Sequence, residues 1–278
     1  MAFDPTFDDT RWTWEWLKLP YVQIAPGRYR NGYIVRRELI QHAEICGRWY
    51  QLPRPLDCRG LYDPNGTLWM SDTPQERMMM FNNAMASSGR VLIGGLGLGL
   101  YAQYVAPRAR AMTIVERSPE VVEIVWPQIE PAITKAMGGT RPSIVIADIG
   151  SFLAAPTTRS YDTIFLDTWE TLDATRLPKI NHLRQLAMEH TSPGGRVLLW
   201  GYRWMVRMFL DACAALLHMP PAQRESRLQE QTRGRPDAYA LLAPIVQRWS
   251  QDEPSDPAQA LVWCERHILN VTSLSNHG

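Results

Sequence analysis

The sequence predicts an α/β fold built on a doubly wound, mostly parallel sheet, with a small β-rich N-terminal lead-in and a helical C-terminal extension. Two observations predict it. From residue 90 to about residue 217, short apolar runs alternate with helical stretches, as in a sheet assembled from βα units. The apolar run Val91–Ile93 leads into three alternating glycines, Gly95, Gly97 and Gly99, and then into a helical pattern, which is typical of a strand that ends at a ligand-binding turn.

The elements of this sheet can be assigned by residue number. Strands are expected at Arg90–Gly94, Ala111–Glu116, Ser143–Ala147, Tyr161–Asp167 and Arg196–Trp200. Helices are expected to begin near Gly99, Ser118, Ser151, Ala174 and Trp204. Ser118 is a strong helix start because a serine cap precedes Pro119 at the first helical position. Pro193-Gly194-Gly195 is expected to end the preceding helix before the last strand begins.

The chain is expected to divide into three regions, at residues 1–72, 73–217 and 218–278. In the first, Pro and Gly separate short β-prone pieces at Tyr21–Ala25, Tyr33–Arg37, Trp49–Leu52 and Thr67–Met70. The second opens with a helix that starts at Thr73 and runs to about Ala86, just before the glycine-rich strand. In the third region, helices are expected at Ala222–Thr232, Asp237–Trp249 and Asp256–Leu269.

The composition points to a small molecule as the partner. Lys and Arg number 29 against 28 Asp and Glu, so the net charge of +1 offers no basic surface for nucleic acid or an acidic membrane. No apolar run is long enough to span a bilayer, and the N-terminus lacks the pattern of a signal peptide, so a cytoplasmic location is expected. The four cysteines are Cys46, Cys58, Cys213 and Cys264. They have neither CxxC spacing nor paired histidines nearby, so no metal site is expected at them.

Three carboxylates stand at the ends of three successive predicted strands. Glu116 ends the second strand, Asp148 follows the third and Asp167 ends the fourth. Because the carboxyl ends of parallel strands meet at one edge of the sheet, these side chains are expected to converge on the crevice where such folds bind ligands. Glu116, after the glycine turn, is placed to accept hydrogen bonds from ribose hydroxyls.

Two cofactor classes fit a glycine turn followed by an acid. A nicotinamide dinucleotide fits because Gly97, Gly99 and Ala102 match the permissive G-x-G-x-x-A pattern. The segment Gly95-Leu96-Gly97-Leu98-Gly99 also resembles the first motif of the class I S-adenosylmethionine-dependent methyltransferase superfamily, whose fold is Rossmann-like. This resemblance, which we favour, implies S-adenosylmethionine as cofactor.

The resemblance also implies roles for individual residues. The glycines Gly95, Gly97 and Gly99 would bind the cofactor and Glu116 its ribose. Asp148, with its neighbour Ile149, would contact the adenine, and Asp167 would face the methionine end and the acceptor. A dinucleotide enzyme gives no reason for the placement of Asp148 and Asp167.

Within that superfamily the chain most resembles the spermidine synthase group. Ile93 stands where methyltransferases usually carry an acid, and Asp167-Thr168-Trp169-Glu170 resembles the Asp-Ser-Ser-Asp segment in which the first acid helps to deprotonate the attacking amine. Two features depart from that group. Leu98 replaces an acid that would hold the methionine-derived ammonium, and Met79-Met80 replaces a Tyr-His pair for the polyamine. Beyond Asp167 and Glu170, the carboxylates available for a cationic acceptor are Asp72, Glu76 and Asp173.

The expected activity is transfer of a group from S-adenosylmethionine, or a close derivative, to a small-molecule nucleophile. Methyl transfer is the first choice, with Asp167 as base or acceptor anchor and Glu170 in support, and it requires no metal. Aminopropyl transfer from decarboxylated S-adenosylmethionine stays open, as does cyclisation or lyase chemistry on the cofactor. A non-catalytic S-adenosylmethionine-binding regulator or assembly subunit stays open from a different class, and so does a homodimer.

Overall fold

The computed structural model describes residues 24–45, 48–156, 160–250, 254 and 256–274. The described chain forms two compact units. The first comprises the residues up to Thr168 together with Ala187–Trp200, and the second comprises Trp169–Leu186 together with the residues from Gly201 onward. The three regions expected from the sequence stay a prediction, because these units are defined by contacts and not by independent folding. Cys46 and most of the β-prone piece at Tyr21–Ala25 lie outside the described residues.

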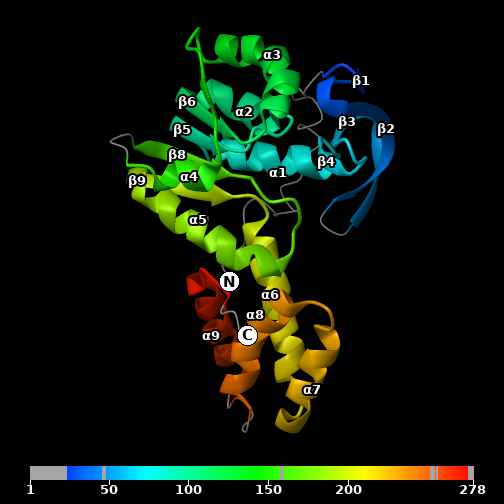
Figure 1. The fold of residues 1–278 in the computed structure, drawn as a ribbon, viewed down its shortest axis with the longest axis vertical. Helices are drawn as coiled ribbons and strands as arrows, with labels where there is room; N and C mark the ends of the chain where they lie inside the picture. Colours follow the sequence, from blue (N-terminus) through cyan, green and yellow to red (C-terminus); the bar gives the residue numbers. More distant parts are fainter. Residues whose placement is uncertain (1–23, 46–47, 157–159, 251–253, 255, 275–278) are drawn as a thin grey trace. The chain divides into compact units, whose positions relative to one another are not determined.

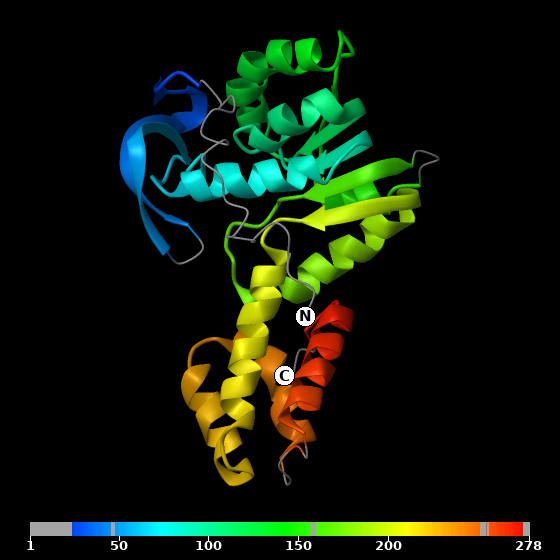
Figure 2. The ribbon, with the colours of Figure 1, turned by 180° about the vertical axis from the view of Figure 1, so that it is seen from behind.

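The first unit contains the predicted parallel sheet (Figures 1 and 2). Its strand order is β7-β6-β5-β8-β9, and every neighbouring pair is parallel. The strands are β5 (Gly89–Gly94), β6 (Ala109–Glu116), β7 (Ser143–Ile146), β8 (Tyr161–Leu166) and β9 (Thr191–Leu199). The chain therefore has the Rossmann-like α/β fold expected from the sequence. In β5, Val91, Leu92 and Ile93 are almost completely buried, as a central strand covered on both faces requires.

One expected boundary in this sheet is wrong. Pro193-Gly194-Gly195 lies inside β9 and not before it. The register explains the difference: Tyr161 pairs with Thr191 but Thr163 pairs with Arg196, so the residues 192–195 form an irregularity within the strand. Proline and glycine are tolerated there because a bulge does not need a regular ladder of N–H donors.

The helices that connect these strands begin close to their expected starts. They are α1 (Pro74–Met85), α2 (Leu100–Val105), α3 (Pro119–Ala136), α4 (Ile149–Ala154) and α5 (Leu177–Glu189), with short 3-10 helices at Ala106–Arg108 and Ala174–Arg176. The Ser118 hydroxyl accepts a hydrogen bond from the Val121 N–H at 3.2 Å, which confirms it as the cap of α3. Thr73 caps α1 in the same way, through the Glu76 N–H.

The N-terminal part of this unit is an antiparallel sheet of order β1-β2-β3-β4. It comprises β1 (Gly27–Arg28), β2 (Ile34–Ile45), β3 (Arg48–Tyr62) and β4 (Leu68–Ser71), with a 3-10 turn at Arg30–Gly32. The pieces expected at Tyr33–Arg37 and Trp49–Leu52 are thus parts of one long β2–β3 hairpin, and the piece expected at Thr67–Met70 overlaps β4. The register shifts where residues 52–55 of β3 stand opposite a single residue of β2. Two of these four residues are prolines, and for that reason the sequence did not predict a continuous strand.

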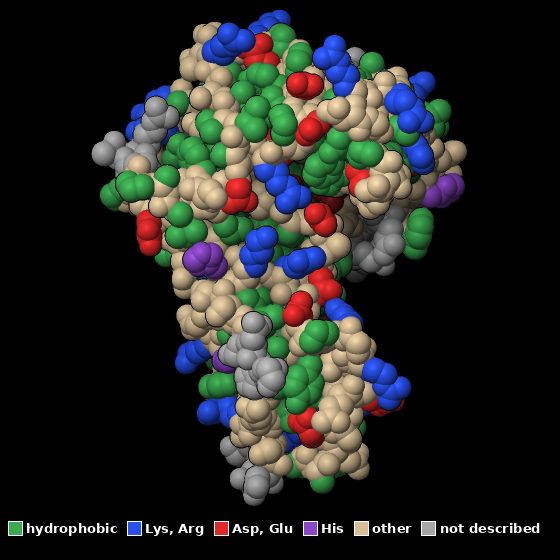
Figure 3. Space-filling model, viewed as in Figure 1, with side chains coloured by type: hydrophobic (Ala, Val, Ile, Leu, Met, Phe, Trp, Pro, Cys, Tyr) green, Lys and Arg blue, Asp and Glu red, His purple; other side chains and the backbone are tan. Residues whose placement is uncertain are grey.

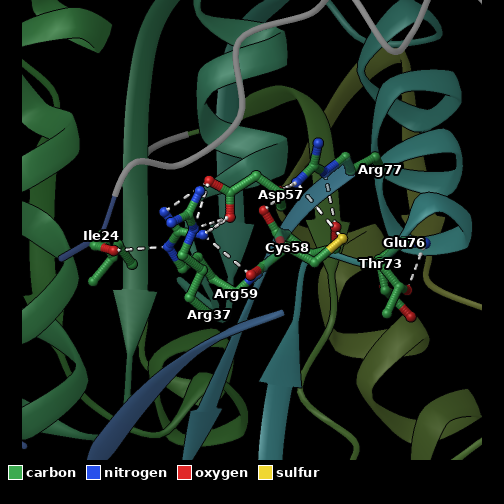
Figure 4. A network of polar contacts seen from close by, with 9 residues as sticks. Ile24, Arg37, Asp57, Cys58, Arg59, Thr73, Glu76 and Arg77 are labelled. Carbon is green, nitrogen blue, oxygen red and sulfur yellow. Dashed lines mark hydrogen bonds and ion pairs between the residues drawn. The ribbon is translucent and has the colours of Figure 1, made fainter. Parts of the chain in front are cut away.

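A buried polar network joins this sheet to α1 (Figure 4). Arg77 of α1 and Asp72, which follows β4, are both almost completely buried, and their side chains form an ion pair at 2.7 Å. The Arg77 guanidinium also donates to the backbone oxygens of Asp72 at 2.8 Å and Asp57 at 2.6 Å. Its neighbour in the network, Arg59, donates to the Ile24 carbonyl at 3.0 Å. The first turn of α1 is therefore fixed by charged groups that have no access to water.

The second unit is helical. It contains α6 (Tyr202–Leu217), α7 (Pro221–Gln231), α8 (Pro236–Arg248) and α9 (Pro257–Asn270), which confirms the helices expected near these positions. Helix α6 packs against the other three. The buried Asn181 side chain donates to the backbone oxygens of Ile268 and Val271, each at 2.7 Å, and so ties the start of α5 to the end of α9.

The surface carries no concentration of one charge on the face shown in Figure 3, where basic and acidic side chains are interspersed. In the part of the chain that the structure describes, no helix combines the length and the apolar character needed to cross a membrane.

Candidate functional site

The site follows from the strand order. Strand β5 lies between β6 and β8, so the chain leaves β5 toward one side of the sheet and returns on the other. In open α/β sheets, ligands bind outside the carboxyl ends of the strands at such a reversal. The glycine turn after β5, Glu116 at the end of β6 and Asp167 after β8 all belong to this edge. All three are in the first unit.

The three glycines of the turn have different roles. Gly95 has φ +93°, and a Cβ there would lie 2.2 Å from the Asp167 carbonyl oxygen, so only glycine fits between the two strand ends. Gly99 has φ +77°, and a Cβ there would meet the Ile129 side chain at 2.3 Å, so it allows α3 to approach the start of α2. Gly97 also has positive φ, but a Cβ there would meet nothing within 4 Å. The turn is therefore open at Gly97, where a ligand can reach the backbone.

Glu116 holds this turn in place. Its side chain is 6% exposed, with one carboxylate oxygen accepting from the Leu96 N–H at 2.8 Å and the other from the Ser118 N–H at 2.9 Å. Each carboxylate oxygen can accept a further hydrogen bond, so the same group can both fix the turn and receive donors such as hydroxyls.

Asp148 and Ile149 occupy the loop after β7. Asp148 is exposed, and its side chain accepts from the Ser151 N–H at 2.9 Å, so it is the N-cap of α4. Ile149 is buried and lies against the end of β5, since a Cβ at Gly94 would be 2.8 Å from its side chain. This geometry gives both residues a structural role and leaves the Asp148 carboxylate at the ligand edge of the sheet.

Asp167 is the most perturbed acid of this edge. Its N–H donates to the Gly94 carbonyl at 2.9 Å, which continues the pairing of β8 with β5 by one residue. Burial raises the pKa of its carboxyl well above the ordinary value, and the nearby carboxylates of Glu76 and Glu116 raise it further. The folded protein therefore disfavours the charged form of Asp167 more than water does.

Glu76, in the first turn of α1, is the second perturbed acid. Burial raises its pKa to about 7, and the Trp200 side chain, which faces it, opposes that rise. Trp200 directly follows β9, and its N–H donates to the Leu166 carbonyl at 3.0 Å. Among the described residues, no acceptor makes a hydrogen bond of good geometry with the buried Trp200 Nε1.

The remaining acids considered from the sequence lie elsewhere. Asp72 is fully buried and paired with Arg77. Asp173 caps the 3-10 helix at Ala174–Arg176 and pairs with Arg235 at 2.8 Å. Glu170 is exposed and belongs to the second unit, so the structure does not place it together with Asp167 in one unit.

Two residues of this edge were given no firm role by the sequence. Glu76 was one of three candidate acids of equal standing, because nothing in its helical pattern distinguishes it. Trp200 was only the last residue of an expected strand. A carboxylate at the first turn of the helix before the glycine strand is a weak signal, and no sequence signal marks Trp200.

Within residues 24–45, 48–156, 160–250, 254 and 256–274, no set of three or more His, Cys, Asp or Glu side chains is arranged to hold a metal ion.

Comparisons with known proteins give only distant similarity. No protein-family model matches the chain, and no curated protein matches it. Among solved structures, it is similar to the N-methyltransferase NodS from Bradyrhizobium japonicum WM9 at 17% identity and a TM-score of 0.35, covering 51% of this chain and 84% of NodS. NodS has also been solved with S-adenosyl-L-homocysteine.

Two further solved structures are similar over a shorter part. One is a precorrin 8w decarboxylase from Methanobacterium thermoautotrophicum, at 15% identity and a TM-score of 0.34, covering 46% of this chain and 62% of that one. The other is an S-adenosylmethionine-dependent methyltransferase from Clostridium acetobutylicum, at 16% identity and a TM-score of 0.31, covering 42% and 44%. The chain thus spans less than two thirds of the length of these two proteins. Similarity of this extent assigns neither a family nor an activity to it.

Proposed function

We propose that the chain binds S-adenosylmethionine and transfers its methyl group to a small-molecule nucleophile. The observation that carries this proposal is the open turn at Gly97, flanked by the Glu116 carboxylate on one side of β5 and the Asp167 carboxyl on the other. A ligand docked at this turn would meet the Glu116 oxygens, which can accept hydrogen bonds from hydroxyls, at one end and the Asp167 carboxyl, whose pKa is raised, at the other.

The described residues fit an adenosyl ligand. The Glu116 oxygens, each already holding one backbone N–H, have acceptor capacity left for two ribose hydroxyls. The backbone from Gly95 to Gly99 can approach the ligand closely because no Cβ stands in the way at Gly97. Asp148 would accept a hydrogen bond from the adenine amino group with the carboxylate oxygen that does not cap α4, and Ile149 would contact the adenine.

When bound, S-adenosylmethionine supplies an electrophilic methyl group on a sulfonium, and the protein needs to position the acceptor and take its proton. Asp167, in its ionised form, would take the proton, since a carboxylate whose pKa is raised is a stronger base than an ordinary carboxylate. From the sequence we propose Glu170, three residues further along the chain, as the residue that supports it.

The alternatives predict different products. Aminopropyl transfer from decarboxylated S-adenosylmethionine is supported by the two perturbed acids, which suit a cationic acceptor, but Leu98 is buried at the position where an acid would be expected for that chemistry. Incubating the protein with S-adenosylmethionine, alone and with candidate amines, separates these reactions by mass spectrometry. S-adenosylhomocysteine would indicate methyl transfer, whereas 5′-methylthioadenosine would indicate aminopropyl, cyclisation or lyase chemistry.

Asp167→Asn tests the assignment of the base. The variant is expected to keep its affinity for S-adenosylhomocysteine and to lose about 100- to 10,000-fold in turnover, the usual contribution of a positioned general base. Glu123→Gln is the matched control, since it removes a carboxylate from an exposed position of α3 in the same unit. A protein that binds NAD but no adenosyl sulfonium would contradict the proposal. One that binds S-adenosylmethionine without any turnover would instead be a regulator.

A further inference from the structure

A cavity of about 480 Å³ lies in the second unit, where α8 ends and α9 begins. A volume of this size is within the range of small-molecule sites in proteins. The end of α8 contributes Arg248 and Trp249 to the cavity, and α9 contributes Val262, Trp263 and Arg266. We refer to this cavity as the α8–α9 pocket. The proposed function uses none of these residues, so binding there does not depend on methyl transfer.

Two tryptophan rings and a guanidinium group pack together in the α8–α9 pocket. The rings of Trp249 and Trp263 meet edge to face, with their centroids 5.2 Å apart and an angle of 89° between their planes. The central carbon of the Arg248 guanidinium lies 4.5 Å from the centroid of the Trp263 ring and 5.3 Å from that of Trp249. The His267 ring stacks on Trp263 at 5.0 Å. Contacts with ring faces hold the guanidinium without using its N–H donors, which lie in its own plane.

The aromatic side of the pocket is fixed by the core of the second unit. The fully buried Arg224 of α7 donates to the backbone carbonyl of Trp249 and to two further backbone carbonyls, at 2.9 and 3.1 Å. On α9, Cys264 and Ile268 are fully buried, which sets the orientation of the helix that carries Trp263. The rings are therefore positioned before a ligand arrives, and such preorganisation favours binding.

The charges in the pocket favour an anion. Asp256 is the N-cap of α9, since its side chain accepts from the Ala258 N–H at 2.9 Å and the Gln259 N–H at 3.3 Å. Among the described residues, no hydrogen bond or ion pair joins the guanidinium of Arg248 or of Arg266 to another residue. An anionic ligand would therefore meet two guanidinium groups whose donors have no acceptor within the described chain.

The pocket also offers apolar surface that water still reaches. The Val262 side chain is 48% exposed. Val262 precedes Arg266 by four residues on α9, so the two side chains lie on the same face of the helix. A ligand that joins an anionic group to an apolar body would cover Val262 while its charge meets Arg266.

We propose that the α8–α9 pocket binds an aromatic carboxylate, with Arg248 and Arg266 donating to the carboxylate and Trp249 and Val262 contacting the ring. The planar fork of a guanidinium matches the two oxygens of a carboxylate, and an aromatic ring suits an indole surface. The two arginines would repel a metal cation, and a small inorganic anion would leave the apolar surface uncovered.

Calorimetry of 2-naphthoate binding to the full chain tests this proposal. The wild type is expected to bind, and Arg248→Gln should bind about tenfold more weakly, the low end for a charge-assisted contact because Arg248 is exposed. The neutral analogue 2-naphthamide should bind the wild type at least about tenfold more weakly than 2-naphthoate, and Arg248→Gln should change its affinity little.

Two further variants sharpen this test. Arg248→Lys keeps the charge without the planar fork, so its affinity for 2-naphthoate should fall between those of Arg248→Gln and the wild type. Arg233→Gln is the matched control and should bind like the wild type, since it removes an exposed arginine of the second unit that does not line the pocket.

Val262→Asp tests the same site by adding a charge. The new carboxylate would pair with Arg266, four residues further on, and repel the carboxylate of the ligand, so the affinity for 2-naphthoate should fall at least about tenfold. Val262→Asn removes the same apolar surface without the charge and should weaken binding less. Because Val262 is partly exposed, thermal unfolding of both variants should resemble that of the wild type.

Five outcomes would overturn the proposal. They are no binding of 2-naphthoate to the wild type at millimolar concentration, equal 2-naphthoate affinity in Arg248→Gln and the wild type, equal affinity for 2-naphthoate and 2-naphthamide, wild-type affinity in Val262→Asp, and inorganic phosphate bound as tightly as 2-naphthoate. The last would show that the pocket takes a small anion and that the aromatic ring contributes nothing.

Discussion

On one side of β5, the Glu116 carboxylate accepts two backbone N–H groups, from Leu96 and Ser118, while on the other side burial raises the pKa values of Asp167 and Glu76. Both regions belong to the carboxyl edge of one sheet. In the first region two backbone donors fix the carboxylate, whereas in the second burial has the larger effect and the Trp200 side chain opposes it only at Glu76. A carboxylate that already has its donors can shape a loop and still receive hydroxyls, whereas burial with few donors disfavours the charged form of a carboxyl group.

The largest expected effect concerns the buried ion pair between Arg77 and Asp72, which fixes the first turn of α1. Arg77→Met should destabilise the protein by about 3–5 kcal/mol, because it leaves the Asp72 carboxylate buried without its partner. Arg141→Met is the control, since Arg141 is 77% exposed in its pair with Glu130 and such surface pairs contribute about 0–1 kcal/mol. Urea denaturation measures both. Equal losses in the two variants would show that the buried pair does not fix α1.

The second effect concerns the glycine turn. Gly95→Ala should cost about 2–4 kcal/mol, because the added methyl group meets the Asp167 carbonyl and the backbone has positive φ. Gly97→Ala shares the positive φ but has open space around it, so it should cost about 1–2 kcal/mol and mainly weaken adenosyl-ligand binding. Thermal unfolding and calorimetry of the two variants separate strain from ligand contact. The reverse order of stability would contradict the geometry of the turn.

The third effect is a change in stability that differs in direction between the Glu116 region and the Asp167 region. Glu116→Gln should destabilise by about 1–3 kcal/mol, because one of the two accepted N–H groups then faces an amide NH2. Asp167→Asn should leave stability at pH 8 unchanged or higher, since burial already disfavours the charged form. Denaturation of both variants at pH 8 is the measurement. Destabilisation by both would mean that Asp167 also has donors it depends on.

The smallest effect is a pH dependence of stability. The folded-state pKa of Glu76 is raised from 4.5 to about 7, so between these pH values the folded protein keeps a proton that the unfolded chain releases. The free energy of unfolding therefore falls as the pH rises from about 4.5 through 7. Glu76→Gln should therefore gain about 1–2 kcal/mol over the wild type between pH 5 and pH 8, with partial exposure of the side chain and coupling to Asp167 limiting the gain. A constant difference across this range would refute the raised pKa.

The sequence predicted the elements of the sheet well and its irregularities poorly. The five strands of the parallel sheet and the helices that follow them are where apolar periodicity and caps such as Ser118 placed them. The β2–β3 hairpin and the start of β9 were misjudged, because proline and glycine read as breaks when they lie in bulges.

The sequence by itself determined that a glycine turn follows a buried strand and that Glu116, Asp148 and Asp167 stand at strand ends, because both features depend on neighbouring residues. Only the tertiary structure decided how the acids differ. The donors of Glu116 lie 20 residues back at Leu96 and two ahead at Ser118, while Glu76 reaches Asp167 from α1 and Trp200 reaches Glu76 from the end of β9. Burial and partnership of a charge arise from contacts distant in the chain, and residue type alone does not encode them.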